Sequence, residues 1–137
     1  MAEYSGTPLL KKLGIKDGQS VLLCNAPSRL PEELTEYVRA KGEKNFDVVL
    51  LFANSVAMFK AEFGVLTKAI HTEGMIWVAW PKKPSGIRTD LTESLIRDHA
   101  LKTPFVDVKV CAIDDTWSGL KFVIRKELRR SLATGTH

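Results

Sequence analysis

The sequence predicts an α/β fold: a three-layer, Rossmann-like sheet of about five strands, mostly parallel, with a C-terminal antiparallel hairpin. Residues 21–24 are continuously apolar, and residues 46–52 are apolar except for Asp47, which is typical of parallel strands that helices cover on both faces. Helical patterns alternate with these strands, and right-handed crossovers of this kind build a parallel sheet. Two segments that alternate apolar and polar residues close the chain and predict the hairpin.

The chain is expected to open with a short helix followed by a buried strand. Thr7 is a favourable N-cap, Pro8 suits the first helical position, and Gly14 suits the end of the helix. The strand over 21–24 follows and stops at Asn25.

A second helix is expected to begin at Ser28 or Pro31 and to end at Gly42. The strand over 46–52 comes next and ends at the polar pair Asn54-Ser55.

The strongest helical periodicity follows this second strand. Its apolar residues recur at intervals of three and four and form one stripe: Val56, Phe59, Phe63, Leu66 and Ile70. Gly74 is expected to end the helix, and a third strand over 75–80 then stops at Pro81.

The last helix and the hairpin complete the predicted order of elements. Thr89 or Asp90 is expected to cap the helix, with Glu93 in the capping-box position relative to Asp90. Strands with a two-residue period are expected over 106–112 and 120–124, around a turn rich in Asp, Ser and Gly.

The length of 137 residues fits one domain, which we place at residues 1–130, with a flexible tail at 131–137. No apolar run approaches the roughly 20 residues of a membrane helix, and the N-terminal residues lack the apolar stretch of a signal peptide. We therefore expect a cytoplasmic protein that has no membrane partner. The net charge of +4 favours solubility and falls short of a nucleic-acid-binding signature.

The cysteines and histidines predict neither a redox pair nor a metal site. Cys24 and Cys111 lie in apolar runs without Cys-x-x-Cys spacing, so buried, reduced thiols are expected. His71, His99 and His137 have no zinc-ligand spacing relative to them.

The order of elements resembles the second half of a class I S-adenosylmethionine-dependent methyltransferase. Residues 16–23 are similar to the entry to the first strand of those enzymes, 46–51 to their fourth strand, and 74–78 to the glycine-then-strand element that follows their fourth helix. The chain as a whole resembles a bacterial family of short proteins defined as a domain of unknown function. Four segments carry this second resemblance: 3–9, 77–83, 108–114 and 116–119.

The sequence departs from the enzymes where they hold their cofactor. Their first strand runs into a glycine-rich loop, whereas here it runs into residues 25–29, which contain no glycine. Pro27 has a fixed φ and no N–H group, so it cannot cradle a ligand in the same way. Only one helix fits between Cys24 and Phe46, so the strand that carries the ribose contact is absent as well. We therefore expect no cofactor.

Candidate ligand-binding residues gather where the parallel strands end, because ligands of open α/β sheets bind outside the carboxyl ends of the strands. They are Asn25, Asn54, Trp80, Lys82, Lys83, Ser85 and Thr89. The loop over 82–90 combines cations, hydroxyls and a helix start, which favours a phosphate or carboxylate. A solvated basic loop with an ordinary helix cap is the alternative, since Asp90 disfavours an anion there.

The hairpin turn supplies further surface candidates: Asp114, Asp115 and Trp117. The two carboxylates would suit acid–base chemistry or magnesium, but adjacent acids in a turn commonly accept hydrogen bonds from the local backbone. Trp117 would form a contact surface if exposed, or pack back over the sheet. Trp77 and Trp80 are three residues apart on one strand, so they should face opposite sides.

Three functions remain open at this stage. A non-catalytic, methyltransferase-like domain that acts through a protein partner or a homodimer is the leading hypothesis. A binding protein or enzyme for a small anion, using the loop over 82–90, is the alternative, and active methyl transfer is the third. Catalytic residues are not assigned, because sequence alone brings no Ser-His-Asp or Cys-His set together.

Overall fold

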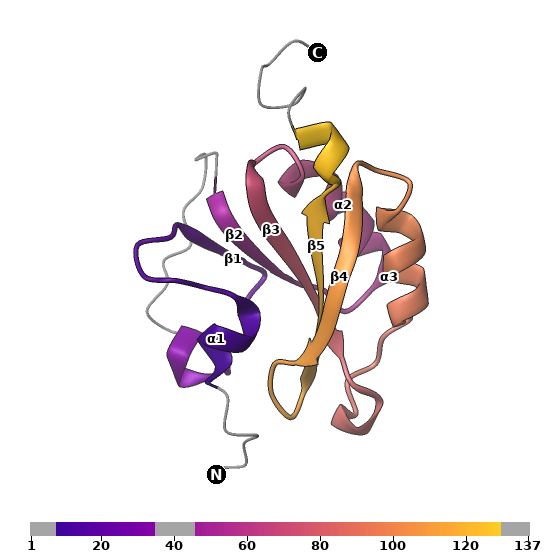
Figure 1. Ribbon diagram of the computed structural model, residues 1–137. Helices are drawn as coiled ribbons and strands as arrows, with labels where there is room; N and C mark the ends of the chain where they lie inside the picture. The colour runs from indigo at the N-terminus through magenta and orange to yellow at the C-terminus, as the bar shows by residue number, and fades with distance from the viewer. Residues whose placement is uncertain (1–7, 35–45, 130–137) are drawn as a thin grey trace.

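The computed structural model describes residues 8–34 and 46–129 and contains one five-stranded sheet with helices on both faces (Figure 1). The spatial order of the strands is β1-β2-β3-β5-β4. The strands are β1 Val21–Cys24, β2 Phe46–Phe52, β3 Ile70–Pro81, β4 Phe105–Ala112 and β5 Trp117–Ile124. The labelled helices are α1 Leu9–Leu13, α2 Val56–Leu66 and α3 Glu93–Ala100, with 3₁₀ turns η1 Glu32–Leu34 and η2 Lys83–Ser85. Residues 126–129 after β5 are also helical (Figure 1). No helix of the described part is long and apolar enough to cross a membrane.

The expectation of a mostly parallel, Rossmann-like sheet is wrong, because the sheet is mixed. Strand β2 pairs in parallel with β1 and β3, but β5 pairs antiparallel with both β3 and β4. The sequence shows that the last two strands form a hairpin, but not which of them lies inside the sheet. Because β5 lies between β3 and β4, one reversed strand produces two antiparallel pairings.

Side chains of the strands alternate between two hydrophobic cores, one on each face of the sheet. On β3, Ile76, Val78 and Trp80 join the core under α2 and α3, whereas Trp77 and Ala79 join the core under α1 and η1. The predicted opposite facing of Trp77 and Trp80 is therefore confirmed. Burial on both faces explains the apolar runs 21–24, 48–52 and 75–80 within these strands.

Trp77 attaches α1 to the centre of the sheet. Its indole Nε1 donates a buried hydrogen bond of 2.9 Å to the carbonyl oxygen of Leu13, and its side chain is 0% exposed. Gly119 of β5 leaves room for the ring, since a Cβ atom there would lie 3.0 Å from Trp77 Cε3. Gly14 ends the helix with φ 80°, as predicted for the terminator.

The helix expected from Val56 to Gly74 is shorter than predicted. α2 ends at Leu66, and β3 already begins at Ile70. The amide of Phe46 donates to the carbonyl of Ala69, and Ile70 pairs with Phe46 in the sheet. Ile70, the last apolar residue of the predicted stripe, therefore belongs to β3 and not to the helix. Thus the 3–4 periodicity predicts α2 correctly but overestimates its length.

The helix after the basic loop begins later than predicted. Thr92, rather than Thr89 or Asp90, is the N-cap of α3, and its Oγ1 accepts from the amide of Leu95. Leu91 is buried ahead of the helix, whereas Leu95 and Leu101 are exposed.

The helix predicted between Ser28 or Pro31 and Gly42 is described only in part, as the 3₁₀ turn η1. Its remainder lies outside the described residues, as do Thr7 and the predicted tail at 131–137.

Strand β4 is the edge of the sheet and contains a β-bulge that the alternating sequence does not predict. Asp107 lies opposite Phe122, and Lys109 lies opposite Lys121, so the register shifts between Asp107 and Lys109. Adjacent β5 residues face opposite sides of the sheet, and therefore Asp107 and Lys109 do as well.

We predict opposite effects of two glycine-to-alanine substitutions. A Cβ atom at Gly74 would lie 2.7 Å from the carbonyl oxygen of Asp47, whereas one at Gly64 of α2 meets nothing within 4 Å. Gly74→Ala should therefore lower the free energy of unfolding by about 2 kcal/mol. Gly64→Ala, the matched control, should raise it by about 0.5–1 kcal/mol, because alanine favours the helix. Urea denaturation of both variants checks this, and equal effects would contradict the close packing at Gly74.

We also predict a pH dependence from His99, which packs edge-on against Phe59 and Phe63. Burial lowers the pKa of His99, and Lys60 and Lys102 lower it further. The unfolded chain therefore binds more protons between that lowered pKa and the usual value of about 6.5, so this contribution to stability is full above about pH 6.5 and declines below it. Urea denaturation at about pH 7.5 and 5.5 should show a smaller loss for His99→Gln than for the wild type. An equal loss would contradict the role of His99.

Candidate functional site

The basic loop and the hairpin turn lie together at one end of the sheet (Figure 1). The amide of Lys82 donates to the carbonyl oxygen of Thr116 at 2.8 Å, which fixes the start of the loop to the turn. Asn25 follows β1 with a left-handed φ of 56°, and Asn54 follows β2; both side chains are exposed. Within the described part of the chain, no hydrogen bond joins either asparagine to the basic loop.

The hydroxyl groups of the basic loop are occupied by the loop itself. Ser85 Oγ donates to the carbonyl oxygen of Lys82 at 2.6 Å and accepts from the amide of Ile87 at 3.1 Å. Thr89 Oγ1 accepts from the amide of Leu91 at 3.0 Å. These contacts build the turns of the loop, so Lys82 and Lys83 are the candidates within the loop whose side chains have no polar contact among the described residues.

Asp90 caps a helix, but the helix is α2 rather than the one that follows it in sequence. Asp90 Oδ1 accepts from the amide of Val56 at 2.8 Å, and Ser55 Oγ accepts from the amide of Met58 at 3.1 Å. A carboxylate therefore already holds the positive end of α2. This contact spans 34 residues, so capping rules based on local sequence do not find it.

The two tryptophans of the candidate set are buried. Trp80 packs in the core under α2 and α3, and Trp117 packs in the opposite core. The ring of Trp117 meets that of Phe52 edge-on, with centroids 5.1 Å apart. Trp117 thus follows the alternative of packing back over the sheet.

The two acids of the hairpin turn differ, because Asp114 accepts hydrogen bonds from the local backbone and Asp115 is exposed. Asp114 Oδ1 accepts from the amides of Thr116 and Trp117, both at 2.8 Å, which is the local backbone role expected of an acid in a turn. Asp115 is exposed. Across residues 8–34 and 46–129, no cluster of three or more His, Cys, Asp or Glu side chains forms a metal site.

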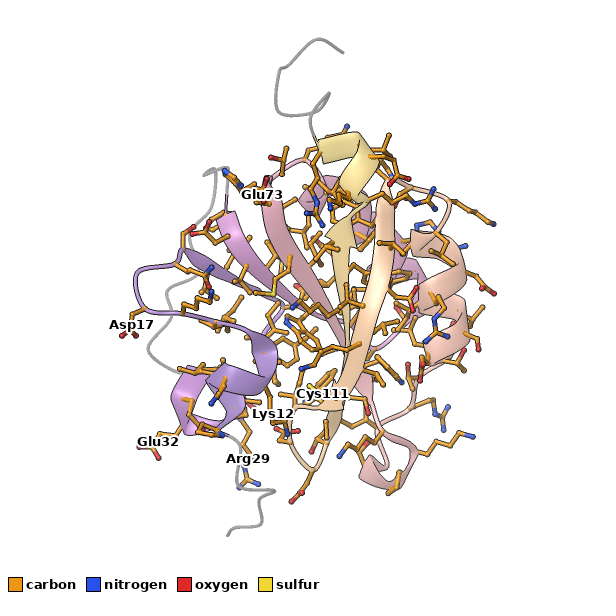
Figure 2. The ribbon with its side chains drawn as sticks, in the orientation of Figure 1. Lys12, Asp17, Arg29, Glu32, Glu73 and Cys111 are labelled. Carbon is orange, nitrogen blue, oxygen red and sulfur yellow. The ribbon has the colours of Figure 1, made fainter. Side chains whose placement is uncertain are left out.

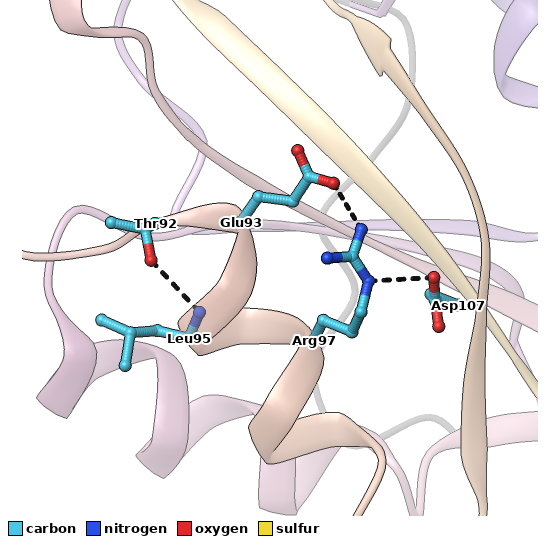
Figure 3. A network of polar contacts seen from close by, with 5 residues as sticks. All are labelled: Thr92, Glu93, Leu95, Arg97 and Asp107. Carbon is cyan, nitrogen blue, oxygen red and sulfur yellow. Dashed lines mark hydrogen bonds and ion pairs between the residues drawn. The ribbon is translucent and has the colours of Figure 1, made fainter.

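Arg97 of α3 forms two ion pairs on the face of the sheet that α2 and α3 cover (Figure 3). Its guanidinium contacts Glu93 one turn earlier and donates from Nε to Asp107 Oδ2 of β4 at 3.0 Å. The hydrogen bond to Glu93 and then that to Asp107 raise the pKa of Arg97. This network ties α3 to the residue at which β4 bulges.

Three lysines converge on the half of the sheet that α1 leaves open, a cluster that the sequence does not single out. Lys109 and Lys121 lie directly opposite each other on β4 and β5, and Lys12 belongs to α1. Cys111, a free and partly buried thiol, lies two residues beyond Lys109 on the same face of β4. Burial raises the pKa of Cys111, while Lys12 and Lys109 lower it, so both ammonium groups are near the sulfur. Alternation along β4 and β5 predicts strand faces, but the bulge is needed to place Lys109 opposite Lys121.

No family model matches the sequence, and neither does any curated protein. Among solved structures, the chain is similar to LepI, whose structure is described as a complex with SAM. The similarity has a TM-score of 0.48 at 13% sequence identity and covers 85% of this chain. The chain spans 39% of the length of LepI. A likeness of this size assigns neither a family nor a ligand.

We predict that Asp90 stabilises the fold through α2. Asp90→Ala should lower the free energy of unfolding by about 1 kcal/mol, because it leaves the amide of Val56 without its acceptor. Asp90→Asn keeps an oxygen and should lose only the charge contribution of about 0.3–1 kcal/mol. Asp115→Ala removes an exposed acid and should change stability by less than about 0.5 kcal/mol. Urea denaturation would contradict the cap if Asp90→Ala and Asp115→Ala behaved alike.

Proposed function

We propose that this domain is a protein-interaction module that binds an extended segment of a partner at the outer edge of β4. Within the described residues, β4 pairs on one side only, with β5. The observation that carries the proposal is its exposed apolar surface: Val108 is 50% exposed and Val110 is 49% exposed. A strand edge with apolar side chains can accept another strand through its backbone hydrogen-bonding groups.

The bulge limits where a partner strand can add. Pairing is regular from Lys109 to Ala112 and irregular at Asp107, and bulges are one means by which proteins protect sheet edges. A partner segment would therefore pair along 109–112 and place apolar side chains beside Val110.

Charge favours a different protein over a second copy of this chain. Antiparallel self-pairing centred on Val110 would place the Lys109 residues of the two copies diagonally across the new strand pair, within reach of each other, on the face that also carries Lys121. Like charges close together across strands are destabilising. A partner with an acidic residue on this face would instead gain attraction, in keeping with the net charge of +4.

Two other functions draw less support from the geometry. A small-anion site on the loop over 82–90 would rely on Lys82 and Lys83, because the hydroxyls of Ser85 and Thr89 already have partners. Methyl transfer would require S-adenosylmethionine to bind beside Asn25, where the chain has no glycine-rich loop. Calorimetry that detected micromolar binding of S-adenosylmethionine would contradict the interaction proposal.

The proposal predicts that an acidic strand-forming peptide binds at β4. The probe is acetyl-Thr-Val-Glu-Val-Glu-Val-Thr-amide, titrated into the ¹⁵N-labelled protein, with a peptide that carries Lys in place of Glu as its control. Amide shifts should centre on β4 and β5 for the acidic peptide only. Val110→Asp should weaken binding by about tenfold or more, since it removes apolar contact and adds repulsion.

Val65→Asp is the matched control, because Val65 is 65% exposed on α2, which lies on another part of the surface. It should leave the peptide affinity within about twofold of the wild type. Equal weakening by both substitutions would contradict docking at β4. Light scattering that showed a dimer for the wild type and a monomer for Val110→Asp would identify a second copy as the occupant and contradict the acidic partner.

A further inference from the structure

The face of β4 and β5 beside α1 brings together positive charges from three separate elements. Lys109 and Lys121 are directly opposed across the antiparallel pair, where Cβ atoms of such residues stand about 4.5–5.5 Å apart. Like charges in this position oppose folding. The placement is imposed by the bulge, which turns Lys109 away from α3 and toward Lys121.

Helix α1 supplies the third charge and the wall of the site. Figure 2 shows Lys12 of α1 beside Cys111 of β4, and both Lys12 and Lys109 act on the Cys111 thiol. A Cβ atom at Gly14, the end of α1, would lie 3.5 Å from Lys121 Nζ. The ammonium group of Lys121 therefore stands against α1.

The cluster carries no compensating carboxylate from the described residues. The ion pairs of the described residues are those of Arg97 with Glu93 and Asp107, and they lie on the opposite face of the sheet. The nearby carbonyl of Leu13 already accepts from Trp77. Burial, and then the charge of Lys109, lower the pKa of Lys121, as expected for an ammonium group held without an anion.

We propose that Lys12, Lys109 and Lys121 form a binding site for a phosphate dianion. Ammonium groups from three directions can each donate to phosphate oxygens, and two negative charges offset the repulsion between the opposed lysines. Cys111 and Val123, which pack partly against the core beneath α1, form the floor of the site. The raised pKa of Cys111 keeps its thiol protonated, so we assign the cysteine a packing role beneath the phosphate and no role as a nucleophile.

The phosphate has two sources, free phosphate and a phosphorylated residue of the segment that we place at β4. Strand addition at 109–112 would set a partner side chain beside Lys109, so a phosphothreonine would reach the same site. The proposal for the site does not depend on strand binding, because inorganic phosphate tests it alone.

The experiment measures binding of inorganic phosphate to the full chain by NMR titration and thermal unfolding, with sodium chloride at matched ionic strength as the reference. The wild type should show saturable shifts at β4, β5 and α1, and a raised Tm, below about 20 mM phosphate. Lys109→Gln should weaken binding by about tenfold or more. The same substitution should raise the Tm of the free protein by about 1–4 °C, because it removes the like-charge pair.

Two controls separate the site from general positive charge. Lys11→Gln removes an exposed lysine next to Lys12 on the same helix, and Lys83→Gln removes one from the basic loop. Both should bind phosphate within about twofold of the wild type. The proposal is overturned if the wild type shows no saturable effect, if Lys109→Gln binds as the wild type does, or if either control loses as much affinity.

A pair of peptides identifies the source of the phosphate. Acetyl-Thr-Val-pThr-Val-Thr-amide is compared with the same peptide without the phosphoryl group. Binding of the phosphopeptide more tightly than inorganic phosphate, lost in Lys109→Gln, supports a phosphorylated partner at the site. Inorganic phosphate as the tighter ligand supports free phosphate at the same site. If the strand-pairing variant Val110→Asp abolishes peptide binding but not phosphate binding, both proposals stand.

Discussion

The hydrogen bond from Trp77 to the carbonyl of Leu13 determines which part of the sheet is covered. The indole lies at the centre of the sheet, fully buried, and Gly119 gives it the space to lie flat beside β5. A buried indole N–H without an acceptor is costly, so α1 is held over β3. Among the described elements, α1 and η1 pack on this face, chiefly over β1, β2 and β3. Both proposals use β4, which lies beyond them at the edge of the sheet.

Several of the described carboxylates make contacts that stabilise the fold, and none of these contacts is with the lysine cluster. Asp90 caps α2, Asp107 and Glu93 hold Arg97, and Asp114 closes the hairpin turn. Each of these carboxylates serves the fold at a helix end, an ion pair or a turn. The lysines of the open face receive no such partner within the described residues. Salt screens the repulsion between two solvent-exposed lysines, so such a pair costs little stability at high ionic strength. Partial burial of Lys121 beside α1 reduces this screening. Among the described residues this charge has no carboxylate partner, and the phosphate that we propose would supply the counter-charge.

Much of the fold could be predicted from the sequence, because its signals are local. Strands β1 and β2 have the expected bounds, since burial on both faces leaves them almost wholly apolar, with Asp47 near the start of β2 as the exception. Contacts between distant segments account for the errors. Ile70 continues the helical stripe but pairs with Phe46 in the sheet, and Asp90 resembles a cap for α3 but reaches Val56 of α2. Ligand binding at the ends of the strands stays a prediction. The hydrogen-bond partners of Ser85 and Thr89 could be found only from the path of the loop.

The bulge in β4 shows why the lysine cluster could not be predicted. Strict alternation places Asp107 and Lys109 on the same face, where both would lie against α3. The extra residue reverses this relation, so that Asp107 meets Arg97 while Lys109 meets Lys121 on the other side of the sheet. A single irregularity therefore produces both the ion pair that holds α3 and a positive cluster for which residues 8–34 and 46–129 provide no ion pair. A bulge alone is enough to protect an edge strand against aggregation. Protection does not require that Lys109 of β4 lie opposite Lys121 of β5. That opposition lowers stability and is offset when an anion binds, which is the physical reason for assigning the cluster to a ligand.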